Sequence, residues 1–331
     1  MPGVDGTGGV RMGVAVTVRV PASSANLGPG FDTMGLALTL YDLVTVEAFP
    51  AGPGRAPGAV VDVAGEGAGT VPDGEEHLVV RSIRAGLERA GVRQPGLRLQ
   101  CVNAIPHGKG LGSSAAAIVA GLVAARNLLE VPERLDEAAV FTLASLAEGH
   151  PDNAAAAAFG GFVVSWFEEP SPRGSSVPSA PRYVGLPVDP RVRPVVFVPE
   201  EQLPTSAARA MLPATVPHGD AAFTAARAAL LVEALTRRPD LLLQATQERL
   251  HQAQRAPAMP ATAALLAVLR GLGAPAVVSG AGPSILVLCP SEDSVAKVLT
   301  EVARRNQARG RWTVLTPGVD TTGGCLVDAS T

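Results

Sequence analysis

The first half of the chain contains segments in which apolar and polar residues alternate, and others in which apolar residues recur with the period of a helix. Alternation predicts strands and helical spacing predicts helices. The predicted strands are residues 14–20, 35–48, 97–102 and 162–167. The predicted helices are residues 76–91, 113–129 and 135–148. Residues 21–30, rich in Pro, Ser and Gly, are expected to interrupt the first strand, and residues 51–69 to form a hairpin with exposed turns.

Strand and helix patterns also mix in the second half. Strands are predicted at residues 193–198, 276–279 and 284–288 and again from Trp312 onward. Helices are predicted at residues 206–212, 220–236, 240–252, 261–272 and 291–309. Residues 168–181, rich in Pro and Ser, show no periodicity and predict a linker. The pattern therefore indicates an α+β protein without internal repeats, whose halves divide near residues 165–185.

Length and charge narrow the classes of protein to which the chain can belong. Its 331 residues suggest two domains, and 27 Lys and Arg against 30 Asp and Glu give a net charge of −3. This balance argues against a dedicated nucleic-acid or membrane-surface binder. The three cysteines are odd in number and widely spaced, and they match neither a disulfide framework nor the spacing of metal ligands.

The apolar stretches are all shorter than the ~20 residues of a membrane span. Residues 1–13 are rich in glycine and lack the apolar core of a signal peptide. We therefore expect a flexible N-terminal tail at residues 1–13 and a cytoplasmic protein.

The most specific local feature is a glycine-rich loop, residues 106–114, that leads directly into an alanine-rich helix. Glycine at positions 108, 110 and 112 lets backbone N–H groups approach an anion, and the helix start adds free N–H groups and a positive dipole end. The hydroxyls of Ser113 and Ser114 can cap the helix or reach a phosphate or Mg²⁺. The spacing fits neither a Walker A loop nor a dinucleotide fingerprint. A simple connection with a serine cap remains the alternative, but the combination favours phosphate binding.

This loop resembles the second motif of the GHMP kinases, a superfamily of ATP-dependent small-molecule kinases. Residues 21–32 resemble the first motif and residues 278–284 the third, in the family's order and over nearly the whole chain. The resemblance implies a two-domain α+β fold, with an N-terminal α/β nucleotide domain at residues 14–170 and a C-terminal ferredoxin-like α+β domain at residues 171–331. It also implies that ATP contacts Pro106, His107, Gly108, Lys109, Gly110, Leu111, Gly112, Ser113, Ser114 and Ala115.

Four runs resemble the homoserine kinase branch of this family in particular: residues 25–32, residues 148–153, residues 203–206 with Arg209, and residues 250–252 with Arg255. The branch implies phosphorylation of L-homoserine by ATP, a step of threonine biosynthesis. It places Glu148 and Ser114 at Mg²⁺ and gives catalytic roles to both and to Asn153. It lines the amino-acid pocket with Asn26, Asp32, His150, Asn153, Thr205, Arg209 and Arg255.

Elementary chemistry agrees with this pocket. An amino-acid substrate needs a carboxylate for its ammonium group, which Asp32 can supply, and a guanidinium for its carboxylate, which Arg209 or Arg255 can supply. Taken singly, Asn26 and Asp32 are also typical turn residues, and the two arginines are typical exposed helix residues. Their joint occurrence in the family's order favours the functional interpretation.

The sequence does not point to a general base. Asn153 cannot accept a proton at neutral pH, and no lysine lies near the first motif, so we expect direct transfer of the phosphoryl group. Two alternatives stay open: a GHMP kinase for another small alcohol, such as L-threonine or a mevalonate-type substrate, and a non-catalytic nucleotide-binding regulator. The sequence also leaves open whether the chain forms a homodimer.

Overall fold

The computed structural model describes residues 9–50, 58–168, 180–306 and 312–327, without the side chains of residues 305 and 306. The strands are β1 (Ala15–Asn26), β2 (Gly30–Phe49), β3 (Ala59–Gly65), β4 (Gly96–Asn103), β5 (Phe162–Phe167), β6 (Pro181–Leu186), β7 (Arg193–Pro199), β8 (Ala276–Val278), β9 (Ile285–Cys289), β10 (Trp312–Leu315) and β11 (Cys325–Leu326). The helices are α1 (Leu78–Arg89), α2 (Ser113–Leu128), α3 (Glu137–Glu148), α4 (Pro151–Phe159), α5 (Thr205–Ala210), α6 (His218–Thr236), α7 (Leu242–Ala245), α8 (Gln252–Arg255), α9 (Pro260–Gly271) and α10 (Glu292–Asn306), with short 3₁₀ turns at Gly74–Glu76, Pro132–Leu135, Pro239–Leu241 and Ala256–Ala258.

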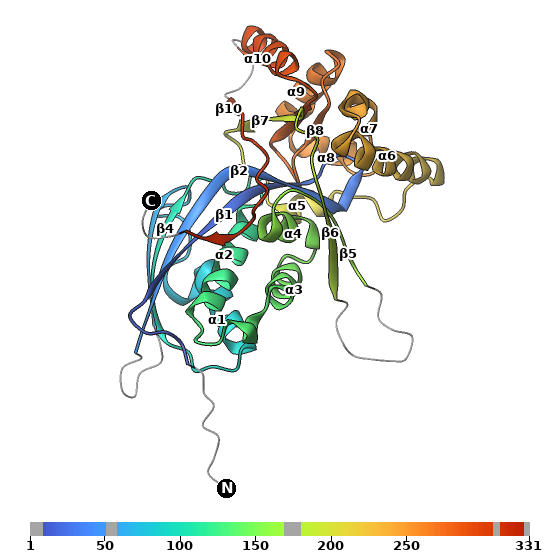
Figure 1. The fold of residues 1–331 in the computed structure, drawn as a ribbon. Helices are drawn as coiled ribbons and strands as arrows, with labels where there is room; N and C mark the ends of the chain where they lie inside the picture. The colour runs from blue at the N-terminus through green and yellow to red at the C-terminus, as the bar shows by residue number, and fades with distance from the viewer. Residues whose placement is uncertain (1–8, 51–57, 169–179, 307–311, 328–331) are drawn as a thin grey trace.

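The described strands form two sheets. The larger has seven strands, with the order β11-β1-β2-β4-β3, and continues from β2 through β5 to β6. The smaller has the order β10-β7-β9-β8. Neighbouring strands are antiparallel except for β3 and β4, which are parallel. Figure 1 shows α1 to α4 beside the larger sheet and α6 to α10 grouped around the smaller one. This is the two-body α+β architecture predicted from the motifs.

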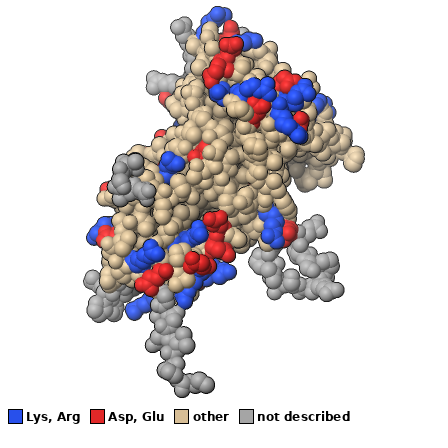
Figure 2. All heavy atoms as spheres, viewed as in Figure 1, with Lys and Arg blue, Asp and Glu red and all other residues tan. Residues whose placement is uncertain are grey.

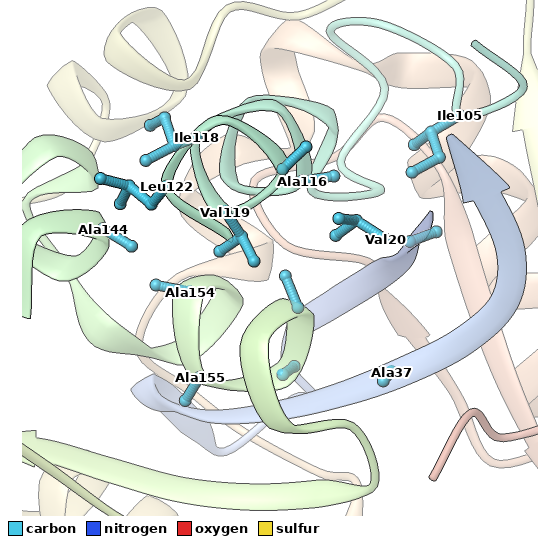
Figure 3. Close-up of a cluster of buried hydrophobic side chains, with 14 of the residues drawn as sticks. Val20, Ala37, Ile105, Ala116, Ile118, Val119, Leu122, Ala144, Ala154 and Ala155 are labelled. Atoms are coloured by element: carbon cyan, nitrogen blue, oxygen red, sulfur yellow. The ribbon is translucent and has the colours of Figure 1, made fainter. Parts of the chain in front are cut away.

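Alanines let α2, α3 and α4 pack closely against one another, and let α2 and α4 pack on the larger sheet. Figure 3 shows Ala116 of α2, Ala144 of α3 and Ala154 of α4 among the buried residues between these helices, and all three are inaccessible to solvent. The alanines at positions 154–157 are all buried. At Gly35 of β2, a Cβ atom would lie 2.4 Å from the Asp152 carbonyl oxygen, so the start of α4 rests against the strand backbone. The small side chains of the alanine run and the missing Cβ atom of Gly35 therefore let α4 lie close to β2.

A separate cluster of buried side chains holds the smaller sheet to its helices. It includes Phe197 of β7, Ile285 of β9, Leu269 of α9 and Val298 of α10. β7 and β9 are short apolar runs that are buried at nearly every position, and the helical spacing that predicted α9 and α10 gives each of these helices one buried face. Those predictions are confirmed.

Several sequence predictions are wrong in detail. The first strand does not stop at Val20: β1 continues to Asn26 with a register shift between Pro21 and Ala22, because β2 pairs with it along this whole length. The predicted helix at residues 240–252 is instead a 3₁₀ turn, the short α7 and a connection to α8. Of the predicted hairpin at residues 51–69, residues 51–57 lie outside the described residues, and β3 pairs in parallel with β4. A local pattern cannot identify a strand's partner, which explains this last error.

Two segments connect the C-terminal part of the sequence to the larger sheet. β6 pairs with β5, although most of the predicted linker between them lies outside the described residues. After β10 the chain returns to the larger sheet, where Cys325 and Leu326 of β11 pair with β1 (Figure 1). Both strands lie beyond the boundary predicted at residues 170–171. The exact division into domains therefore stays a prediction.

Residues 1–8 of the predicted N-terminal tail lie outside the described residues. Val10 is buried and forms a β-bridge with Leu129, so this end of the segment is attached to the fold. No helix in the described ranges is long and apolar enough to cross a membrane. On the face shown in Figure 2, acidic and basic side chains lie together in mixed groups. Broad uncharged areas lie between these groups. This agrees with the balanced composition.

Candidate active site

The glycine-rich loop connects β4 to α2, and close packing requires glycine at two of its positions. Gly108, Gly110 and Gly112 have φ values of 66°, 76° and 69°, in the region that favours glycine. A Cβ atom on Gly110 would lie 2.2 Å from the Ser279 carbonyl oxygen, and one on Gly112 would lie 2.0 Å from Ser23 Oγ. The loop therefore lies directly against both β1 and the turn between β8 and β9.

Helix α2 begins immediately after this loop, and no described side chain caps it. Neither serine acts as the cap that the sequence allowed. Ser114 instead donates a hydrogen bond to Glu148 Oε1, at 2.5 Å between the oxygens. The first N–H groups of α2 thus have no side-chain acceptor among the described residues. An uncapped helix start beside a glycine-rich loop is suited to bind an anion.

The turn between β1 and β2, together with the first residues of β2, has an unusual backbone. Asn26, Leu27 and Asp32 have φ values of 68°, 47° and 55°, which non-glycine residues rarely adopt. Asn26 stabilises the turn in two directions. Its Nδ2 donates to the Gly280 carbonyl oxygen at 2.8 Å, and its Oδ1 accepts from the Asp32 N–H at 2.9 Å. Backbone strain of this kind persists only where surrounding contacts hold it, and it is concentrated at functional sites.

The corner between α3 and α4 supplies a third group of polar side chains. Glu148 ends α3, and His150 is the residue before α4. His150 Nδ1 lies 2.6 Å from Asp152 Oδ1, which also accepts from the Asn153 N–H at 2.7 Å. Asn153 Oδ1 accepts from Ser23 Oγ at 2.9 Å. These bonds fix Asn153 between the start of α4 and β1.

Burial and neighbouring charges change the acidity of two groups at this corner. Burial raises the pKa of the Glu148 carboxyl above its ordinary value, although the hydrogen bond from Ser114 opposes the change. Burial alone would lower the pKa of His150, but its hydrogen bond to the Asp152 carboxylate and the charge of that group outweigh this effect and raise the pKa. The surroundings of His150 therefore favour its protonated form, and those of Glu148 disfavour its charged form.

Two arginines face the site in different states. Arg209 of α5 forms a bidentate ion pair with Asp32, with N–O distances of 2.8 and 2.9 Å. Arg255 of α8 is only 2% exposed and forms no ion pair with a described carboxylate. A buried guanidinium without a counter-ion is costly. Arg255 is therefore the cation in this site with the strongest need for an anionic ligand.

These groups line one cavity of about 130 Å³, to which both bodies of the fold contribute. Every residue predicted for the amino-acid pocket lines it: Asn26, Asp32, His150, Asn153, Thr205, Arg209 and Arg255. Glu148, Ser113, Ser114 and the three loop glycines complete the predicted part of the wall. Ala25, Asp152, Gly280 and Ala281 also line it, without a role assigned from the sequence. All four lie within the motifs, so their position in the sequence was the signal that could have identified them.

The remaining loop residues predicted to bind ATP do not line this cavity. Lys109 Nζ donates to the Pro199 carbonyl oxygen at 2.7 Å, and Leu111 and Ala115 are buried. Pro106 is also absent from the cavity wall. His107 lines a neighbouring cavity instead.

That neighbouring cavity, of about 260 Å³, shares Ser113 and Ser114 with the first. Its wall is mainly apolar and includes Val44, Val71, Pro72, Leu78, Val79, Ala117 and Ala120. The imidazole of His77 also lines it, and its buried Nδ1 has no hydrogen-bond partner among the described residues. Burial lowers the pKa of His77, so the ring is neutral and Nδ1 can donate or accept a single bond. An unpartnered buried nitrogen in an apolar cavity suits a flat, polar-edged ligand.

Comparison with known proteins agrees with this geometry. Residues 77–161 match the N-terminal domain of the GHMP kinases and residues 226–308 their C-terminal domain. The chain is 53% identical over 279 residues to a homoserine kinase of Streptomyces coelicolor, covering 84% of this chain and 85% of that protein. It is 51% identical over 302 residues to a homoserine kinase of Rhodococcus erythropolis, covering 90% and 93%.

A crystal structure of homoserine kinase from Cytophaga hutchinsonii superposes on the fold with a TM-score of 0.79 at 26% identity, covering 95% of this chain and 97% of that one. Sequence motifs, the fold and the assembled cavity thus lead to one conclusion: the chain belongs to the homoserine kinase family of the GHMP kinases.

Proposed function

We propose that this chain transfers the γ-phosphoryl group of ATP to the side-chain hydroxyl of L-homoserine, giving O-phospho-L-homoserine and ADP for threonine biosynthesis. The observation that carries the proposal is a single cavity that joins an uncapped helix start and glycine-rich loop to Asp32, Arg209 and the unpaired Arg255. The first part suits phosphates, and the second suits an amino acid's ammonium and carboxylate groups. We also propose a cytoplasmic location, because the reaction needs ATP and the three cysteines are free.

The charged residues hold the substrate in the proposed complex. Arg255 binds the carboxylate of homoserine, and the ammonium group competes with Arg209 for Asp32. The pair between Asp32 and Arg209 is partly exposed, so its exchange for substrate costs little. Asn153 and His150 orient the hydroxyl toward the loop.

Phosphoryl transfer then needs alignment and charge neutralisation. The hydroxyl oxygen forms a bond to the γ-phosphorus as the bond from that phosphorus to the bridging oxygen of ADP breaks. The hydroxyl proton passes to the phosphate or to solvent. Loop N–H groups and the start of α2 stabilise the negative charge on the phosphates.

Glu148 and Ser114 fit a magnesium ion. Both offer oxygen atoms, the ligand type that Mg²⁺ prefers, and the partly buried Glu148 carboxylate would gain the counter-ion it lacks. In the described part of the chain no three His, Cys, Asp or Glu residues are grouped to hold a metal alone. Mg²⁺ commonly completes its coordination with water and substrate phosphates, which agrees with this sparse set. When bound, the ion would neutralise charge on the phosphates.

The neighbouring cavity is the proposed adenine site. It is continuous with the phosphate loop through Ser113 and Ser114, its wall is apolar, and His77 Nδ1 can bond to a ring nitrogen or amino group of the base. His107 in its wall agrees with the predicted contact to ATP.

The direct test measures ADP release by the purified chain with ATP, Mg²⁺ and L-homoserine. Activity should be lost on chelation with EDTA and return when Mg²⁺ is restored, and L-threonine and mevalonate should be poorer substrates. Binding of ATP without turnover of any of the three alcohols would favour the regulator, and a preference for another alcohol would identify the second alternative.

Asp152→Asn tests whether a general base operates. Asp152 is 1% exposed and its Oδ1 already contacts His150 and the Asn153 N–H, so we assign it a positioning role. The variant should lower kcat by about tenfold or less, whereas loss of a general base typically costs about 10²–10⁴-fold. A larger fall in a variant with unchanged thermal unfolding would contradict direct transfer.

Glu148→Gln tests the partly buried carboxylate. Burial raises the pKa of Glu148, so its ionised form destabilises the metal-free fold at any pH above the pKa that this group has in the unfolded chain. At lower pH the group is neutral in both the folded and the unfolded chain, and this penalty disappears. The metal-free variant should unfold about 2 °C higher at neutral pH, with no difference near pH 4, and should have lost activity. The exposed Glu88→Gln is the control. If Glu148→Gln instead lowered the unfolding temperature at neutral pH, the assigned penalty would be contradicted.

Ala117→Leu tests the adenine site. The larger side chain would fill part of the neighbouring cavity, which Ala117 lines, and should raise KM for ATP by about 10-fold or more. KM for homoserine should change less than about twofold, because homoserine binds in the other cavity. Ala138→Leu on the exposed face of α3 is the matched control. An unchanged KM for ATP would indicate that adenine binds at another site.

A further inference from the structure

His251 is a buried histidine next to the active site that has no role in the reaction described above. It is 1% exposed and precedes α8, which carries Arg255. Its Nε2 lies 2.8 Å from the Gly28 carbonyl oxygen in the turn between β1 and β2. A carbonyl oxygen only accepts, so Nε2 carries the proton and donates.

This bond determines what the other ring nitrogen can do. With the proton on Nε2, the neutral ring has a lone pair on Nδ1, and Arg255 Nη1 lies 3.4 Å from it. Burial lowers the pKa of His251 against the opposing effect of Glu248, which agrees with a neutral ring. One imidazole therefore contacts both the first-motif turn and the buried guanidinium.

Arg255 has few other fixed contacts. Its Nε donates to the Ala208 carbonyl oxygen at 3.2 Å, and its Nη1 lies 3.5 Å from the Gly280 carbonyl oxygen. These contacts are long for hydrogen bonds to a charged donor. The contact to His251 Nδ1, at 3.4 Å, is similarly long, so several weak contacts together hold the guanidinium. His251 is the only side chain of the described residues with a hydrogen-bond contact to it, and the ring centroid of Phe31 lies 5.4 Å from its Cζ.

The turn that His251 contacts through Nε2 leads to Asp32, the proposed partner of the substrate's ammonium group. The ring of Phe31 lies 5.0 Å from that of His251, and the next residue is Asp32. The turn is also held in place at Gly28, where a Cβ atom would lie 2.8 Å from the Thr246 carbonyl oxygen. His251 thus joins the element with the proposed ammonium anchor to the element with the proposed carboxylate anchor.

We propose that His251 is a positioning residue that sets Arg255 at a fixed place relative to the turn of Asp32, and thereby makes the enzyme select alcohols that carry both an ammonium and a carboxylate group. The proposal rests on the proposed function. It deepens it, because homoserine bears the two charges on one carbon atom and the two anchors must match their spacing.

The test uses two substitutions that each keep one of the ring's contacts. His251→Gln places an amide nitrogen near the position of Nε2 and keeps the bond to Gly28, without an acceptor for Arg255. His251→Asn places an oxygen near the position of Nδ1 and keeps that acceptor, without the bond to Gly28. Each variant is assayed with ATP and L-homoserine, and with 3-aminopropan-1-ol, which is homoserine without its carboxylate.

Both variants should lose about 10- to 100-fold in kcat/KM for homoserine, mainly through KM, and less than about threefold for 3-aminopropan-1-ol. KM for ATP should stay within about twofold. The exposed His218→Gln is the matched control and should leave all constants unchanged. Equal losses on the two alcohols, or no loss in one of the variants, would overturn the role of His251.

Wild-type protein separates failure of the inference from failure of the proposed function. If it does not phosphorylate homoserine, the proposed function fails and the inference with it; if it does, the outcome for the variants decides the inference alone. Protein labelled with ¹⁵N-histidine gives a measurement that does not depend on the variants folding. A solvent-protected neutral Nε2–H ring should shift its Nδ1 signal with homoserine and not with 3-aminopropan-1-ol, and an unchanged signal would overturn the proposal.

Discussion

The active site depends on the close approach of three backbone segments at Gly110 and Gly112. Neither position has room for a Cβ atom, because the Ser279 carbonyl oxygen and Ser23 Oγ occupy that space. Ser279 Oγ reinforces the contact, lying 2.6 Å from the Gly110 carbonyl oxygen and 2.8 Å from Ser24 Oγ. The glycine-rich loop is thus held against β1 and against the turn after β8. Because β8 belongs to the smaller sheet, the same contact joins the two bodies of the fold.

Two side chains near this contact lie in surroundings that disfavour their charged forms. Glu148 is a carboxylate whose pKa burial raises, and Arg255 is a buried guanidinium whose pKa burial lowers. In each case the ionised form is destabilised by its surroundings, so a bound ion of opposite charge would relieve the cost. A metal ion and a substrate carboxylate are such ions. The net charge of −3 says nothing of this, because the compensation is local.

Much of the site could be predicted from the sequence because its residues lie in short motifs. The backbone freedom required at positions 108, 110 and 112, and the polar residues at positions 26, 32 and 148–153, are visible in the chain itself. The pairing of Asp32 with Arg209 was not, since 177 positions separate them. The cavity beside His77 was also missed, because it is built from apolar residues on several elements that no motif marks.

The sequence by itself determined the period of most strands and helices, the glycines that allow a tight loop, and the family to which the motifs point. These are local properties: backbone dihedral preference, side-chain periodicity and residue chemistry. The tertiary structure decided how far β1 extends, that β3 pairs in parallel with β4, and that β11 returns to β1. It also decided that His251 lies between Gly28 and Arg255. Such pairings arise from packing between distant segments, and the free energy that selects them is not contained in any one stretch of sequence.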